Sequence, residues 1–136
     1  MKDKLKVAFI CVHNSCRSQI AEALGKKLAA NEFDSYSAGS EISKGINEDA
    51  IRIVKEIYGI DMKKDQYPKL IDDLPDVDLV ITMGCNVTCP IVDGKYHEDW
   101  GLEDPTAKSD EDFIKVIKAI EENIIRLKKN IKFYIN

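Results

Sequence analysis

A cysteine and an arginine six positions apart, Cys11 and Arg17, are the first residues in this sequence whose spacing suggests chemistry. A thiolate is a good nucleophile. A guanidinium presents a planar fork of donors that matches two oxygens of a phosphate-like group. Taken alone, Cys11 is as easily a buried strand residue, and Arg17 a solvated surface charge. Together they predict a site that holds a tetrahedral oxyanion against a thiolate.

The residues around this pair predict how it is positioned. The run from Val7 to Val12 is short, apolar and rich in β-branched residues, which is typical of a buried strand. A helix that fades near Asn31 follows, and its apolar face consists of Ile20, Ala21, Leu24 and Leu28. Between the two lies a tight loop that ends in a helix N-terminus, where backbone N–H groups and the helix dipole favour an anion and a thiolate.

The loop residues are the candidate oxyanion ligands. We expect the oxyanion to be bound by His13, Asn14, Ser15, Cys16, Arg17 and Ser18. Asn14 and Ser18 can also hydrogen-bond within the loop or to the sulfur of Cys11.

Length and composition limit the class of protein. A chain of 136 residues with ordinary composition predicts a single domain over residues 1–136. The net charge of −4, with no basic cluster interleaved with aromatic residues, argues against nucleic-acid binding. No apolar run approaches the ~20 residues that span a bilayer, and the first run is too short for a signal-peptide core. We therefore expect a cytoplasmic protein without a membrane partner, whose thiols stay reduced.

Apolar runs and alternating patterns predict the other strands of the chain. These strands lie at Phe33 to Gly39, at Asp78 to Met83 and near Lys95 to Trp100. They alternate with helices, and the strongest strands are apolar throughout, which favours a parallel sheet covered on both faces. Right-handed crossovers place the loops after such strands at one edge of the sheet. The segments that carry Cys11, the later cysteines and Asp104 therefore meet there.

Two further helices are predicted after the first. One has its N-cap at Asn47, ends at Gly59 and carries an apolar stripe of Ala50, Ile51, Val54 and Ile57. Residues 61–68 are polar and predict a loop, and Pro68 opens a helical turn that runs through Leu70 and Ile71. The last helix is capped by Ser109, with Asp112 at its third position. Its apolar face consists of Phe113, Val116, Ile117, Ile120, Ile124 and Leu127.

A second pair of cysteines, Cys85 and Cys89, follows the strand at 78–83. Residues four apart on a helix have Cβ atoms about 5–6 Å apart, whereas a disulfide needs about 3.8 Å. The pair can therefore be close but unbonded when reduced, and bridged after local refolding, which indicates a redox role. The alternatives are two incidental thiols, or a zinc site shared with Cys11 and Cys16. Because zinc prefers tighter knuckles and would remove the nucleophile, we expect no metal.

Asp104, which precedes Pro105, is the candidate proton donor. Proline biases the residue before it towards an extended conformation, and an aspartate held over the loop could protonate a leaving oxygen. Three other acids of the same stretch are not separated from it by pattern alone, namely Glu98, Asp99 and Glu103.

With these residues identified, the chain resembles a known family. CVHNSCRSQIAEA (residues 11–23) is similar to the phosphate-binding loop and following helix of the low-molecular-weight protein tyrosine phosphatase superfamily, and the late Asp-Pro pair fits it too. YSAG (36–39), TMGCNVTCP (82–90) and DWGLEDP (99–105) are more similar to its thioredoxin-coupled arsenate reductases. The resemblance covers nearly the whole chain and implies an α/β three-layer sandwich with a central four-stranded parallel sheet.

The resemblance also implies a mechanism, the reduction of arsenate to arsenite. Cys11 would attack arsenate, Arg17 would balance charge and Asp104 would protonate the departing oxygen. Cys85 would then attack Cys11, and Cys89 would attack Cys85, which leaves a Cys85–Cys89 disulfide for thioredoxin to reduce. No bound cofactor is implied, Cys16 would be structural, and we expect a monomer.

The sequence departs from the family pattern in two places. The cysteines Cys85 and Cys89 are closer together than in the best-known members, and Gly84 intervenes between the strand and the first of them. Some members bind potassium partly through an aspartate, where this chain has Lys69, and a lysine would repel a cation. Two other function classes stay open: a phosphatase that works through a Cys11 phosphocysteine, and a non-catalytic zinc or redox-sensing module.

Overall fold

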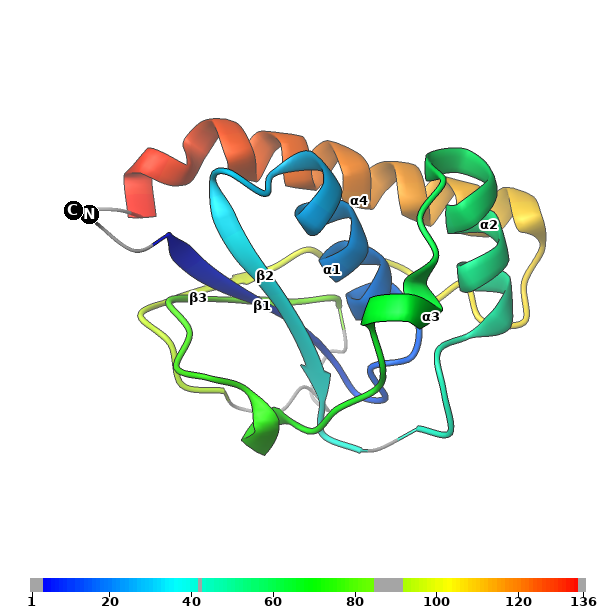
Figure 1. Ribbon diagram of the computed structural model, residues 1–136, viewed down its shortest axis with the longest axis horizontal. Helices are drawn as coiled ribbons and strands as arrows, with labels where there is room; N and C mark the ends of the chain where they lie inside the picture. The colour runs from blue at the N-terminus through cyan, green and yellow to red at the C-terminus, as the bar shows by residue number, and fades with distance from the viewer. Residues whose placement is uncertain (1–3, 42, 85–91, 135–136) are drawn as a thin grey trace.

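The protein is described here by a computed structural model that covers residues 4–41, 43–84 and 92–134 (Figure 1). Its four strands are β1 (Leu5–Cys11), β2 (Phe33–Gly39), β3 (Leu79–Thr82) and β4 (Tyr96–Asp99). All neighbouring strands are parallel and lie in the order β2-β1-β3-β4. The predicted four-stranded parallel sheet is confirmed, although β1 begins two residues earlier than the expected strand and ends at Cys11, before Val12.

Helices cover the sheet mainly on one side. The α-helices are α1 (Arg17–Leu28), α2 (Glu48–Tyr58), α3 (Met62–Asp65) and α4 (Asp110–Asn130). Two short 3₁₀ segments complete the described structure, η1 (Ile71–Asp73) and η3 (Ile131–Tyr134). In Figure 1, α1 and α4 lie against each other over one face of the sheet, with α2 beside the first half of α4.

The strand β1 supplies both halves of the core because its side chains alternate between the two faces. Val7 and Phe9 point to the helical side, where they join a cluster that includes Ile20 of α1 and Ile117 of α4. On the other face lies a smaller cluster, which consists of Ala8, Ile10, Ala38, Val77, Val80 and Val92. Ile71 and Leu74, at η1, pack against this cluster. The second face is therefore covered, as predicted, but by a short turn and extended chain in place of a long helix.

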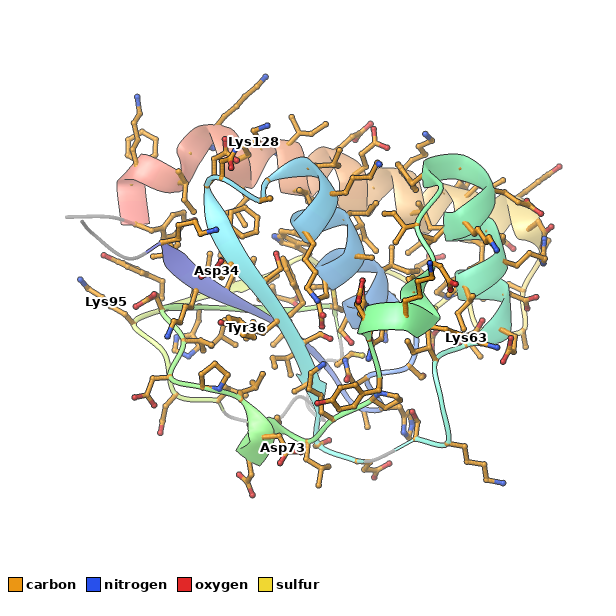
Figure 2. All side chains as sticks on the ribbon, in the orientation of Figure 1. Asp34, Tyr36, Lys63, Asp73, Lys95 and Lys128 are labelled. Atoms are coloured by element: carbon orange, nitrogen blue, oxygen red, sulfur yellow. The ribbon has the colours of Figure 1, made fainter. Side chains whose placement is uncertain are left out.

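The long helices follow their sequence signals. Asn47 caps α2 by accepting a hydrogen bond from the Ala50 N–H at 3.0 Å, and α2 ends at Gly59. Ser109 caps α4 by accepting from the Asp112 N–H at 3.2 Å. All six apolar positions predicted for the last helix are buried. Lys95 and Lys128 are exposed on the surface of this arrangement, as Figure 2 shows.

Three local predictions are wrong. Pro68 does not open a helical turn through Leu70, because Leu70 forms an isolated parallel bridge with Gly39 and the 3₁₀ turn begins at Ile71. The segment 61–68 is not wholly a loop, because residues 62–65 form α3, where Asp61 caps the helix and Met62 is buried. One turn of helix is too short to show a periodic pattern. Ile57 does not continue the buried stripe of α2 and is 37% exposed. No helix in the described part of the chain has both the length and the apolar character to cross a bilayer.

Candidate active site

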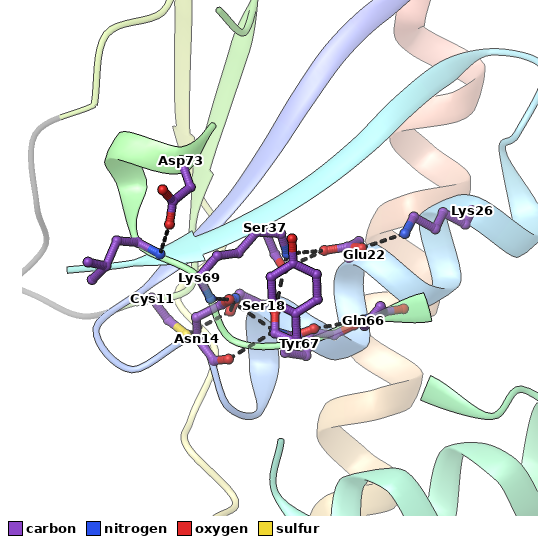
Figure 3. A network of polar contacts seen from close by, with 12 residues as sticks. Cys11, Asn14, Ser18, Glu22, Lys26, Ser37, Gln66, Tyr67, Lys69 and Asp73 are labelled. Carbon is purple, nitrogen blue, oxygen red and sulfur yellow. Dashed lines mark hydrogen bonds and ion pairs between the residues drawn. The ribbon is translucent and has the colours of Figure 1, made fainter. Parts of the chain in front are cut away.

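The reactive thiol lies where β1 ends and the loop begins. Cys11 is the last residue of β1 and is 5% exposed. Its Sγ lies 2.8 Å from the Oγ of Ser18, in the first turn of α1 (Figure 3). Ser18 Oγ also accepts a hydrogen bond from Asn14 Nδ2 at 2.8 Å. The predicted contacts of Asn14 and Ser18, within the loop and to the sulfur, are therefore present.

Asn14 holds the sharp turn of the loop. Its backbone has a φ of 52°, a left-handed conformation that asparagine tolerates better than most residues. Its Oδ1 accepts hydrogen bonds from Gln19 Nε2 and from the backbone N–H of Lys69, both at 2.9 Å. The side chain is fully buried. The sequence predicts Asn14 as a ligand and as a hydrogen-bond partner within the loop, but it gives no sign that Gln19 and Lys69 hold its side chain in place.

The N-terminus of α1, the helix that starts at this loop, can bind an anion. Among the described residues, no side chain caps the N-terminus of α1, and its first turn contains no acid. By contrast, α2 and α4 are capped by side chains and carry acids in their first turns. The first N–H groups of a helix have no partner within the helix, and the dipole makes this end attractive to negative charge. The N-terminus of α1 is thus available to an oxyanion held against Cys11.

The loop also packs directly on Gly39, the last residue of β2. A Cβ atom at Gly39 would lie 2.5 Å from the carbonyl oxygen of Val12 and 2.9 Å from the backbone nitrogen of Asn14. Both atoms belong to the backbone, so no side-chain rotation relieves the clash. We predict that Gly39→Ala lowers the free energy of unfolding by roughly 2 kcal/mol and weakens phosphate binding at the loop. Urea denaturation and phosphate titration test this, with Gly45→Ala as control, since a Cβ at Gly45 meets no atom within 4 Å. Equal stability of the two variants would contradict the prediction.

Arg17 connects the loop to two segments that are distant in sequence. Its Nη1 donates hydrogen bonds to the carbonyl oxygens of Met83 and Leu102, both at 2.6 Å. Met83 directly follows β3, and Leu102 lies two residues before Asp104. Toward the described residues, Nη2 and Nε make no hydrogen bond, so they can still face an oxyanion. Arg17 therefore links the loop to the end of β3 and to the segment that carries Asp104.

The charges of Asp104 and Cys16 act on each other at this edge. Burial is the largest influence on the Asp104 pKa and acts to raise it. Hydrogen bonds from the side chain and backbone of Thr106, together with the charges of Arg17 and Lys108, outweigh burial and lower the pKa. Burial, followed by the charges of Asp104 and Cys11, raises the pKa of Cys16 to about 12. Cys16 therefore remains a thiol at neutral pH, which suits a structural place in the loop.

The other acids near Asp104 have different partners. The side chain of Glu98 contacts Tyr134, that of Asp99 contacts Gly84, and that of Glu103 contacts Lys108. Among the described acids of this stretch, Asp104 alone acts on the Cys16 thiol. The charge of Asp104 thus reaches the loop, and its role as the proton donor stays a prediction.

One predicted ligand turns its side chain away from the loop, and two predicted catalytic residues lie outside the described residues. The side chain of His13 is exposed and pairs with Glu41 at 3.3 Å, so only the backbone N–H of His13 remains a candidate anion donor. The carbonyl of Ser15 accepts a hydrogen bond from the N–H of Asn47 at 2.7 Å, and its place as an oxyanion ligand stays a prediction. Cys85 and Cys89 lie outside the described residues.

The buried carboxylate of Glu22 contacts residues next to the loop. Glu22 of α1 is 3% exposed and accepts hydrogen bonds from Ser37 Oγ and Lys26 Nζ, both at 2.5 Å. The Nζ of Lys69, the residue whose N–H binds Asn14, lies 3.4 Å from Glu22 Oε1, the same oxygen that accepts from Ser37 (Figure 3). Within the described residues there is no group of three or more His, Cys, Asp or Glu side chains arranged for a metal ion.

Taken together, the geometry provides a nucleophile, a cradle and a cation at one edge of the sheet. Cys11 lies at the base, the first turn of α1 presents N–H donors that no described side chain caps, and Arg17 supplies charge beside them. The charge of Asp104 raises the pKa of Cys16, and the charge of Arg17 helps to lower the pKa of Asp104. Such a site can hold a tetrahedral oxyanion while a thiolate attacks its central atom.

Comparison with known proteins identifies similar chains. Residues 6–134 match the family described as low molecular weight phosphotyrosine protein phosphatase. A protein of Staphylococcus epidermidis named arsenate reductase 2 is 40% identical over 127 residues, which cover 90% of this chain and 95% of that protein.

Solved structures of proteins named arsenate reductase are also similar to this chain. One, described as an arsenate reductase in the phosphate binding state, superposes with a TM-score of 0.83 at 38% identity, covering 93% of this chain and 98% of that one. Another is a thioredoxin-dependent arsenate reductase of Corynebacterium glutamicum, with a TM-score of 0.76 at 36% identity. It covers 97% of this chain, which in turn spans 64% of that longer chain.

Proposed function

The chain belongs to the low molecular weight phosphotyrosine protein phosphatase family, and from this premise we propose that it is an arsenate reductase that uses electrons from thioredoxin. One observation carries the proposal: the Cys11 thiol lies in an uncapped anion loop whose arginine binds Met83, at the end of the strand that leads to Cys85 and Cys89.

The first step is attack of the Cys11 thiolate on the arsenic of bound arsenate. A sulfur–arsenic bond forms, an arsenic–oxygen bond breaks, and the departing oxygen takes a proton from Asp104 and leaves as water. In the unliganded site the lowered pKa of Asp104 keeps it a carboxylate. An arsenate dianion beside it favours the protonated form. Substrate binding thus supplies the condition under which Asp104 acts as an acid.

The next steps move electrons through thiols. The Cys85 thiolate attacks the sulfur of Cys11, a disulfide forms, and the sulfur–arsenic bond breaks with its electron pair on arsenic, which leaves as arsenite. The Cys89 thiolate then attacks Cys85 and releases the Cys11 thiolate. Thioredoxin reduces the Cys85–Cys89 disulfide by the same kind of exchange and becomes oxidised itself.

Contacts of the described residues support the first thiol exchange of this relay, the attack of Cys85 on Cys11. Arg17 Nη1 binds the carbonyl of Met83 at 2.6 Å, and Cys85 is the second residue after Met83 in the sequence. If Cys85 and Cys89 were incidental thiols, their function would not require this connection between the anion loop and the residues before them. The roles of Cys85 and Cys89 themselves rest on the sequence and on the named relatives.

Cys89→Ser separates the relay from other schemes. With arsenate in excess and no thioredoxin, we expect this variant to release about one arsenite per chain and then stop, because Cys85 still resolves Cys11. With thioredoxin, its reductase and NADPH, we expect turnover to stop after that first cycle. Cys85→Ser is the matched control and should release no arsenite in either experiment. Sustained NADPH consumption by Cys89→Ser would contradict the relay.

Hydrolysis of phosphate monoesters through a Cys11 phosphocysteine is the second candidate. It needs only Cys11, Arg17 and Asp104, whose segments meet in the described structure. Aryl phosphate hydrolysis should be measured beside arsenate-dependent NADPH consumption. Rapid hydrolysis with no response to arsenate would replace the reductase proposal with the phosphatase.

A further inference from the structure

A second aspartate, Asp99, holds the end of β3 next to the candidate site. It is the last residue of β4 and is paired in the sheet with Thr82, the last residue of β3. One oxygen of its carboxylate, Oδ1, accepts hydrogen bonds from Thr82 Oγ1 at 2.7 Å and from the Gly84 N–H at 2.8 Å. A charged acceptor makes a stronger bond to a backbone N–H than a neutral one does. Asp99 therefore fixes the chain just before position 85.

The residues on either side of this bond are fixed by other contacts. Met83 donates its N–H to Ile10 of β1 and accepts from Arg17. Gly84 has a φ of 87°, and a Cβ atom there would lie 2.9 Å from both Gly101 Cα and the backbone nitrogen of Leu102. The three residues 82–84 are thus each held in place. Asp99 is the only side chain that binds the N–H of Gly84 in the described part of the chain.

Asp99 acts on this end of the strand without reaching the anion loop. Its side chain is exposed, and within the described residues its hydrogen bonds go to Thr82 and Gly84. The oxyanion cradle is built from residues 11–18 and from Arg17 donors that Asp99 does not contact. Loss of Asp99 should consequently leave anion binding intact and change only the chain that leads to Cys85.

We propose that Asp99 is a positioning residue for the thiol exchange, which fixes the backbone from which Cys85 attacks Cys11. This inference rests on the proposed arsenate reductase function. In that step a Cys11–Cys85 disulfide forms, the sulfur–arsenic bond breaks, and arsenic(V) takes the electron pair to become arsenite. Attack on sulfur requires accurate placement of the incoming thiolate. The hydrogen bond to Asp99 fixes Gly84, the residue directly before Cys85 in the sequence.

The test compares two steps in the full chain. Single-turnover arsenite release, with protein in excess and no thioredoxin, reports the attack of Cys85. Titration with inorganic phosphate reports the anion loop alone. For Asp99→Ala we expect release to slow about tenfold, with phosphate affinity within about twofold of the wild type. Asp99→Asn keeps an acceptor oxygen and should restore most of the rate. Asp93→Ala, which removes an exposed carboxylate elsewhere in the same region, is the matched control.

The outcomes distinguish the possibilities. Unchanged release by Asp99→Ala would overturn the positioning role, as would a parallel loss of phosphate affinity, which indicates a general structural effect. If Asp99→Ala fails to fold, Thr82→Val removes one of the two hydrogen bonds and should slow release by a smaller factor, and an unchanged rate there would overturn the role. A wild-type protein that releases no arsenite would instead refute the proposed function, and this inference with it.

Discussion

Arg17→Lys is expected to lower kcat/KM for arsenate by about 100-fold or more. A lysine keeps the positive charge but cannot present a planar fork to two oxygens. In this protein it would also lose the two hydrogen bonds of 2.6 Å that Nη1 donates to Met83 and Leu102. The variant therefore loses oxyanion contacts and the link between the segments on either side of the loop. Coupled NADPH consumption with thioredoxin and its reductase measures the effect.

Arg126→Lys is the matched control for this experiment. Arg126 is an exposed residue of α4 that donates a hydrogen bond to Asn123 three positions earlier. We expect its replacement by lysine to leave kcat/KM within about twofold of the wild type, since exposed helix pairs contribute little. Near-normal arsenate turnover in Arg17→Lys would remove Arg17 from the central place that we give it.

The long elements of the fold could be predicted because their signals are local and repeated. The helix α4 has an apolar residue at every third or fourth position and a serine cap, and the structure buries all six apolar side chains. The helix α2 has a cap at Asn47 and a stop at Gly59. The single turn α3 offers neither length nor period, so a polar composition was misleading there.

In the site, too, the features that could be predicted are local in sequence, and those that could not depend on distant residues. Cys11, Arg17 and the loop between them are adjacent in sequence, and their spacing predicts a shared anion site. The hydrogen bonds that shape this loop come from Lys69, Met83 and Leu102, which lie 55 to 85 positions from their partners. Two of the three use backbone carbonyls, and the third uses a backbone N–H. Such contacts depend on topology and not on residue type, so no sequence pattern marks them.

Asn14→Ala is expected to destabilise the protein by roughly 3 kcal/mol and to abolish most arsenate turnover. The change removes the Oδ1 acceptor of Lys69 N–H and Gln19 Nε2, and the donor to Ser18 Oγ, in a fully buried position. An unpaired buried polar group costs about 1–3 kcal/mol. In addition, alanine at a φ of 52° is strained by about 1 kcal/mol. Urea denaturation gives the free energy of unfolding.

Asn14→Gly separates the two causes, because glycine accepts a positive φ without strain but makes no side-chain hydrogen bond. We expect it to be about 1 kcal/mol more stable than Asn14→Ala. Arsenate turnover should be equally poor, since both variants lose the hydrogen bonds that the Asn14 side chain makes with Ser18 and Lys69. Asn123→Ala on α4 serves as the control for loss of an asparagine side chain. If Asn14→Ala were as stable as the wild type, the buried network around Asn14 would not hold the loop. If Asn14→Gly recovered full turnover, backbone conformation alone would shape the site, and the hydrogen bonds to Lys69 and Ser18 would be dispensable.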